Sequence, residues 1–172
     1  MVGFTGVAIL AKTLTSPLQQ LAREVFINGV DPWRATLMAF GGYGRTRAML
    51  HTPVCVVFRD RNSIEARVFR YSHPKSYPWG IQFTTCPCDP ACNPLPGDLR
   101  WKGENSDKVH EQIKLWCVRC KKRCDEWVRK PSWINDCGTK YLQHFFWTNH
   151  PLTEEQRGFM SRVARSNRIS TR

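Results

Sequence analysis

The chain has 172 residues, of which 41% are hydrophobic and 12% aromatic, a composition that is typical of a folded globular protein and excludes a disordered chain. Lysine and arginine number 26 against 14 aspartate and glutamate residues, giving a formal net charge of +12. This balance favours polyanionic partners such as DNA or RNA. No segment approaches the ~20 apolar residues of a membrane-spanning helix, so we expect no membrane partner.

The first residues, Met1 to Ala11, are mostly apolar but do not have the pattern of a secretory signal. They lack a preceding basic region, and Lys12 follows without a small-x-small cleavage site. We therefore expect a cytoplasmic or nuclear protein. In those compartments thiols stay reduced, and clustered cysteines bind metals more readily than they form disulfides.

Two helices are predicted near the N-terminus. The first has Ser16 as N-cap and Pro17 at its first position, buries Leu18, Leu21, Ala22 and Val25 on one face, and ends at Asn28-Gly29. The second starts at Asp31-Pro32-Trp33, runs through Leu37, Met38 and Phe40, and ends at Gly41-Gly42. The segment Gly41 to Thr46 lacks the Gly-Lys-Ser/Thr ending of a phosphate loop and is interpreted as a turn.

A β-hairpin is predicted next, from Val54–Phe58 and Ile64–Val68 joined by a turn at Asp60 to Ser63. Cys55 lies inside the first strand and is interpreted as a small core residue. Together with the helices, the hairpin predicts a first domain over 1–78, in which a helix pair lies on a small antiparallel sheet.

Six of the eight cysteines fall in two short runs. Zinc takes four tetrahedral ligands, and two cysteines on a tight turn can supply two of them. Short strands at Trp79–Phe83 and Gln112–Trp116 are expected to deliver the two runs, with another around Leu99 to Trp101 between them. The preferred ligands of a closed, structural zinc site are Cys86, Cys88, Cys117 and Cys120, with Cys92 and Cys124 as substitutes or as ligands of a second ion. Disulfides and unliganded thiols are the alternatives.

The order of strand, cysteine turn, loop, strand and cysteine turn resembles the zinc-ribbon class of structural modules. The resemblance covers Trp79 to Trp133 and implies a zinc-stapled β module, predicted as a second domain over 79–135. Zinc ribbons commonly have glycine after the second cysteine of each turn, whereas this chain has Asp89 and Lys121 there.

Basic and aromatic residues surround the second cysteine run. Cations can neutralise phosphates while indoles stack on unpaired bases, so the mixture predicts a nucleic-acid-binding surface. The alternative is that the tryptophans complete a small core and the lysines are solvated around it. The candidate residues are Lys114, Arg119, Lys121, Lys122, Arg123, Arg129, Lys130, Trp116 and Trp127.

The last part of the chain, 136–172, is predicted to be an aromatic segment followed by a basic helix. Thr153-Glu154-Glu155-Gln156 is a capping-box signal for a helix over 156–166. Arginines recur near helical spacing toward the C-terminus, and we expect Arg162, Arg165 and Arg168 to contact phosphates as well.

The histidines provide little support for catalysis. His144 lies in an aromatic stretch and is interpreted as a core residue, and His110 is a possible substitute metal ligand. A thiol or hydrolytic enzyme using Cys137 or Cys55 with a histidine is the weakest hypothesis, because sequence distance does not reveal a Cys-His pair.

The sequence therefore predicts a mixed α+β protein with structural zinc that binds DNA or RNA without catalysing a reaction. The alternative is a zinc-stapled interaction or regulatory module that binds an acidic protein partner.

Overall fold

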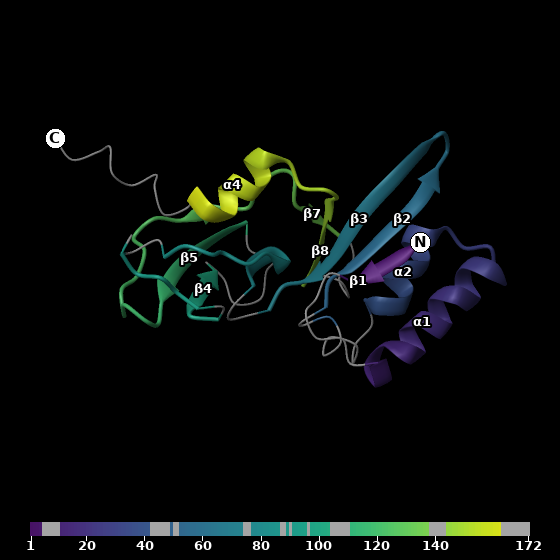
Figure 1. Ribbon diagram of the computed structural model, residues 1–172, viewed down its shortest axis with the longest axis horizontal. Helices are drawn as coiled ribbons and strands as arrows, with labels where there is room; N and C mark the ends of the chain where they lie inside the picture. The colour runs from purple at the N-terminus through teal and green to yellow at the C-terminus, as the bar shows by residue number, and fades with distance from the viewer. Residues whose placement is uncertain are drawn as a thin grey trace. The chain divides into compact units, whose positions relative to one another are not determined.

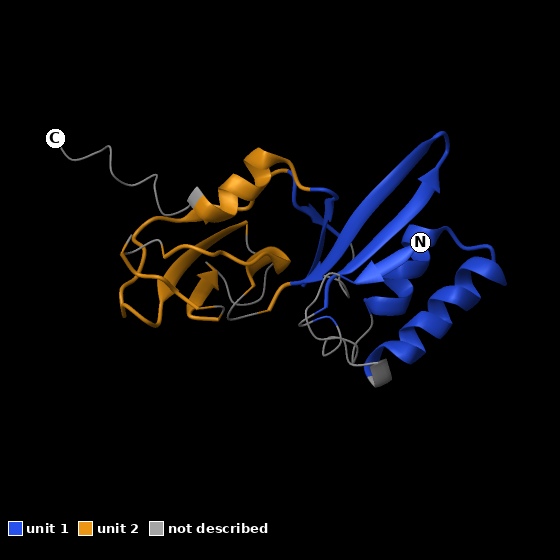
Figure 2. Cartoon of the chain, viewed as in Figure 1, with its two compact units in different colours: residues 1–71, 133–151 blue, residues 72–132, 152–172 orange. Residues whose placement is uncertain are grey.

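The computed structural model contains three helices and two antiparallel sheets among the residues that it describes (Figure 1), so the expected mixed α/β character is confirmed. The chain divides into two compact units (Figure 2). Unit 1 comprises 1–71 and 133–151, and unit 2 comprises 72–132 and 152–172. The structure describes residues 1–4, 11–41, 49, 52–73, 77–86, 89, 91–95, 97–103, 111–137 and 144–162.

The sheet of unit 1 has five strands in the order β1-β2-β3-β8-β7. The predicted hairpin is present: its two strands pair antiparallel, with Asp60 opposite Ser63 at the turn. Two strands near the end of the unit return to this sheet, since β8 pairs with β3, and β7 with β8. The strands are β1 (Val2–Phe4), β2 (Val54–Asp60), β3 (Ser63–Tyr71), β7 (Asn135–Asp136) and β8 (Phe145–Asn149).

Helices α1 (Ala11–Phe26) and α2 (Pro32–Phe40) also belong to unit 1 and lie beside β1 and β2 in Figure 1. The predicted start of α2 is confirmed, because the Asp31 carboxylate accepts a hydrogen bond of 2.9 Å from the Arg34 N–H. The helix ends at Gly41, as expected.

The core of unit 1 lies between these helices and one face of the sheet. Alternate residues of β2 and β3 face it, and several aromatic rings pack in it: the Phe69 and Phe145 rings stack with centroids 5.0 Å apart. Trp33 packs edge-on against Phe69 at 6.1 Å and against Trp147 at 5.6 Å. This pattern follows from the period-two alternation of the strands.

Helix α1 departs from the prediction at its start and in its buried face. It begins at Ala11, so Pro17 is inside the helix and not at its first position. Leu14, Pro17 and Leu21 are the buried positions, whereas Leu18 and Ala22 are exposed. Packing of the Leu14 to Leu21 face outweighs the local stop signal of a proline.

The sheet of unit 2 has three strands in the order β4-β5-β6. The strands β4 (Leu99–Gly103) and β5 (Gln112–Cys117) confirm two predicted strands, and β6 (Val128–Arg129) was not predicted. Helix α4 (Glu154–Arg162) starts at the predicted capping box, because the Gln156 N–H donates to the Thr153 hydroxyl and the Thr153 N–H donates to the Gln156 side chain.

The predicted strand over Trp79–Phe83 is wrong. Pro78–Gly80 form a short 3-10 helix, η1, in which Trp79 and Gly80 have φ of 53° and 70°, and the residues that follow belong to no strand. A strand cannot include two consecutive left-handed residues. Trp79, Ile81 and Phe83 are nevertheless buried, so this segment contributes to the core as an irregular loop.

The units also differ from the predicted contiguous domains 1–78, 79–135 and 136–172. Residues 133–151 return to unit 1 through β7 and β8, while α4 belongs to unit 2. Among the described helices, none is both long and apolar enough to cross a membrane.

Candidate metal centre

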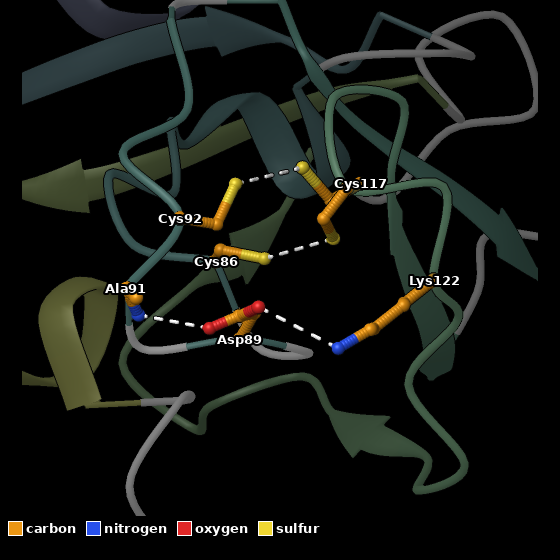
Figure 3. A network of polar contacts seen from close by, with 7 residues as sticks. Cys86, Asp89, Ala91, Cys92, Cys117 and Lys122 are labelled. Atoms are coloured by element: carbon orange, nitrogen blue, oxygen red, sulfur yellow. Dashed lines mark hydrogen bonds and ion pairs between the residues drawn. The ribbon is translucent and has the colours of Figure 1, made fainter.

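Four cysteines of unit 2 lie together with their sulfur atoms all within 4.8 Å of one another. Two come from each cysteine run, and Figure 3 shows the side chains of the two loops turned toward a common centre. The Sγ atoms of Cys86 and Cys120 are 3.6 Å apart, and those of Cys92 and Cys117 are 3.7 Å apart. The four cysteines can therefore coordinate a metal ion.

These separations agree with tetrahedral coordination. A Zn–S bond of ~2.3 Å places the corners of a tetrahedron about 3.8 Å apart. A disulfide would need ~2.05 Å between two sulfurs, so neither pair is bonded. Cys86 and Cys117 are buried, whereas Cys92 and Cys120 are half-buried and therefore partly accessible to solvent.

The first cysteine loop, which carries Cys86 and Cys92, is shaped by Asp89. Its carboxylate accepts a 2.9 Å hydrogen bond from the Ala91 N–H, and its carbonyl accepts one of 3.1 Å from the Cys92 N–H. An aspartate that bonds the backbone two residues ahead forms a local turn. This turn brings Cys92 back toward Cys86.

The second cysteine loop, which carries Cys117 and Cys120, begins where β5 ends. Cys117 is the last residue of the strand, and its N–H donates a 3.0 Å hydrogen bond to the Lys122 carbonyl, closing the turn that carries Cys120. Lys121 has φ of 57°, in the left-handed region. The position at which zinc ribbons commonly have glycine therefore has the backbone conformation that favours glycine, although the residue is lysine.

Two polar contacts join the loops. The Lys122 ammonium lies 3.5 Å from the Asp89 carboxylate, as drawn in Figure 3, and Arg119 donates a 2.6 Å hydrogen bond to the Asn93 carbonyl. Both contacts are exposed, so each contributes little to stability. They do bring the second loop and its cations alongside the first.

The thiols of the cluster influence one another's ionisation. Partial burial, together with hydrogen bonds to Cys117 and Cys86, raises the pKa of Cys92. Burial also acts to raise the pKa of Cys120, but hydrogen bonds from the Lys122 backbone and from neighbouring thiols outweigh it and lower the pKa below its ordinary value. Cys120 therefore ionises before Cys92, and a divalent cation would replace the protons that the sulfurs share.

Among the described residues, the cluster contains three of the four preferred ligands. It contains Cys86, Cys117 and Cys120, and Cys92 was named only as a substitute. Cys88 and His110 lie outside the described residues. Cys124, the other substitute, is buried elsewhere in unit 2, where its N–H donates to the Leu115 carbonyl and it does not join the four described sulfurs. The irregular spacing of the first run did not single out Cys92 as a member of the cluster.

Helix α4 packs beside the first cysteine loop. The Phe159 and Phe83 rings lie 6.1 Å apart, and the Thr85 hydroxyl donates a 2.9 Å hydrogen bond to the Ser161 carbonyl. Thr85 immediately precedes Cys86 of the cluster. The predicted C-terminal helix therefore supports the candidate metal centre through Phe83 and Thr85, a role that the sequence did not suggest.

The structure separates the predicted nucleic-acid-binding residues into groups. Arg119, Lys121 and Lys122 are exposed on the second cysteine loop, and Lys114 and Trp116 lie on β5. Arg123 pairs with Trp116 through an isolated bridge, and Arg129 pairs with Gln112 in β6. The Lys130 N–H donates to the Glu111 carbonyl.

Arg162 ends α4, whereas Arg165, Arg168 and the rest of the tail lie outside the described residues. Arg100 and Lys102 of β4, which the sequence did not single out, pair with Trp116 and Lys114 of β5.

The residues that were considered for enzymatic chemistry, Cys137, Cys55 and His144, lie outside the four-cysteine cluster. Burial raises the pKa of Cys137 to about 12, with Asp136 adding to the shift, and burial also raises the pKa of Cys55. Both thiols are therefore less nucleophilic at neutral pH than an ordinary cysteine. The interpretation of His144 as a core residue is wrong: it precedes β8, is exposed, and contacts the Tyr71 ring edge-on at 6.3 Å.

Comparisons with protein-family models, with curated proteins and with solved structures found no match to this chain.

Proposed function

We propose that this chain is a non-enzymatic nucleic-acid-binding protein whose basic module is held together by a structural zinc ion. The four clustered thiols carry the zinc part of the proposal, because four soft ligands at tetrahedral spacing favour zinc and leave no open position for catalysis. Cys117-x2-Cys120 at the end of β5 supports a relationship to zinc ribbons on the side of the second loop.

The distribution of charge supports nucleic acid as the partner. The formal net charge is +12, and the loop that carries two of the four cysteines also carries Arg119, Lys121 and Lys122. Within the described ranges only two ion pairs form, Arg67 with Glu65 and Lys122 with Asp89. Arg100, Lys102, Arg123 and Arg129 of unit 2 take part in neither pair and can contact phosphates.

The zinc assignment is tested by the metal content of protein purified without added zinc. We expect one zinc per chain, and we expect Cys92→Ser and Cys117→Ser each to lose both the metal and cooperative unfolding, because binding energy at such a site is folding energy. Cys124→Ser is the matched control and should keep its zinc. Unchanged zinc content in Cys92→Ser and Cys117→Ser would contradict the assigned ligands.

The function is tested by titrating a labelled oligonucleotide at increasing salt. Binding through several phosphates releases counterions, so we expect the affinity to fall steeply and log-linearly as salt rises. Absence of binding even at low salt would reject the proposal and favour an acidic protein as the partner.

A further inference from the structure

The sheet of unit 2 has two different faces. Along β5, Ile113, Leu115 and Cys117 are buried, while the intervening Lys114 and Trp116 are more exposed. Because successive side chains of a strand point to opposite faces, the two sets belong to opposite faces. We call the second one the outward face. It consists of Arg100, Lys102, Gln112, Lys114 and Trp116, together with Arg123 and Arg129, which pair directly with Trp116 and Gln112.

The outward face breaks a rule of strand pairing. Lys102 lies directly opposite Lys114 in the β4-β5 register, and like charges at directly paired positions destabilise a sheet. Arg100 follows on the same face, opposite Trp116. None of these three cations forms an ion pair with another residue in the part of the chain that the structure describes. Such unfavourable pairings in natural proteins concentrate at functional sites.

An aromatic ring beside these cations is open to a ligand. The Lys114 ammonium lies 5.2 Å from the centroid of the Trp127 ring, and Trp127 is 40% exposed. A pocket of about 380 Å³ adjoins the same lysine and is lined also by Lys102, Trp116, Arg123 and Asp125. Cations and indoles are thus within reach of one bound ligand.

We infer that the outward face is a platform for single-stranded nucleic acid, on which Trp127 and Trp116 stack unpaired bases while Lys102, Lys114 and Arg123 contact phosphates. This inference rests on the proposed function and specifies its site and substrate class. Stacking requires bases that are unpaired, which a duplex does not offer, and every base has a π-face, so the platform tolerates any sequence. Asp125 at the pocket edge repels a phosphate there, leaving that position to a base edge or sugar hydroxyl.

The test measures the binding of the full zinc-loaded chain to oligo(dT), oligo(U) and a mixed-sequence DNA duplex of about 12 residues each. We expect the chain to bind each single strand at least about ten-fold more tightly than it binds the duplex. Trp127→Ala should weaken single-strand binding about ten-fold, with Trp127→Phe between the two, because a smaller ring stacks less strongly. Lys102→Ala should reduce the salt slope by about one.

The matched control is Arg59→Ala, which removes one positive charge from β2 in unit 1. Zinc content and circular dichroism verify that each variant is folded. If Trp127→Ala loses zinc, the affinities of Trp127→Phe and Lys102→Ala for the single strands test the platform instead. Duplex binding as tight as that of the single strands, or face variants that change affinity no more than Arg59→Ala, would overturn the platform while leaving nucleic-acid binding intact. Failure of the wild-type chain to bind any probe would instead reject the proposed function itself.

Discussion

Lys121 has the left-handed backbone conformation that the second cysteine loop needs for its tight turn. In this region the Cβ atom of an L-residue approaches the backbone closely, so lysine is strained where glycine would not be. The exposed Lys121 side chain makes no hydrogen bond or ion pair recorded among the described residues. Lysine at this position therefore places a positive charge next to Cys120 of the cluster, at a cost in backbone strain.

This strain can be measured with two substitutions at the same position. Lys121→Gly should leave the free energy of unfolding of the zinc-bound protein unchanged within about 1 kcal/mol, because the relief of strain offsets the backbone entropy that glycine loses on folding. Lys121→Val should lower it by about 1 to 2 kcal/mol, since a β-branched residue fits this region worst. Denaturant unfolding at fixed zinc concentration measures both. Equal stability of the two variants would contradict the left-handed turn.

Cys137 allows a pH test of unit 1. Burial raises its pKa from 9.0 to about 12, so the folded state holds this proton more tightly than the unfolded state does. The resulting stability is fully present below pH 9 and is lost as pH rises from 9 toward 12. Relative to Cys137→Ala, the free energy of unfolding of the wild type should fall by about 2 kcal/mol between about pH 7 and about pH 10.5. Parallel pH profiles of the two proteins in urea unfolding would show that folding does not raise the pKa of Cys137.

At the level of elements, the sequence predicted those helix starts and turns that depend only on residues close together in the chain. The N-cap at Asp31, the capping box at Thr153 and the β2-β3 hairpin all follow from short-range chemistry and are present. The strand β1, the return of β8 to β3 and the approach of Cys92 to Cys117 depend on residues far apart in the chain. Periodicity within one window has no information about such pairings.

The packing of α4 predicts that a distant helix residue affects metal binding. Phe159→Ala removes the ring that contacts Phe83, three residues before Cys86, and should destabilise unit 2 by about 2 kcal/mol. We expect the rate of zinc release to a chelator to rise accordingly. Arg157→Ala, an exposed change on the same helix, is the control and should release zinc at the wild-type rate. Identical release from the two variants would show that α4 does not support the metal centre.

At the level of the molecule, the two units are interleaved along the chain. Unit 2 contains the insertion 72–132 between strands β3 and β7 of unit 1, followed by α4. The four cluster sulfurs all belong to unit 2, whereas the core of unit 1 is built from β2, β3, β8 and two helices. The cost of closing a loop grows only slowly with its length, so unit 1 tolerates a long unfolded insertion.

Zinc removal should therefore unfold one unit and spare the other. With the metal chelated, we expect amide hydrogen exchange to rise sharply in β4, β5 and the cysteine loops, because the binding energy of the proposed zinc ion would also be folding energy of unit 2. Exchange in β2, β3 and β8 should stay slow, since their hydrogen bonds and aromatic core do not involve the cluster. Re-addition of zinc should restore protection in unit 2. Loss of protection in both units at the same chelator concentration would show that they fold as one cooperative body.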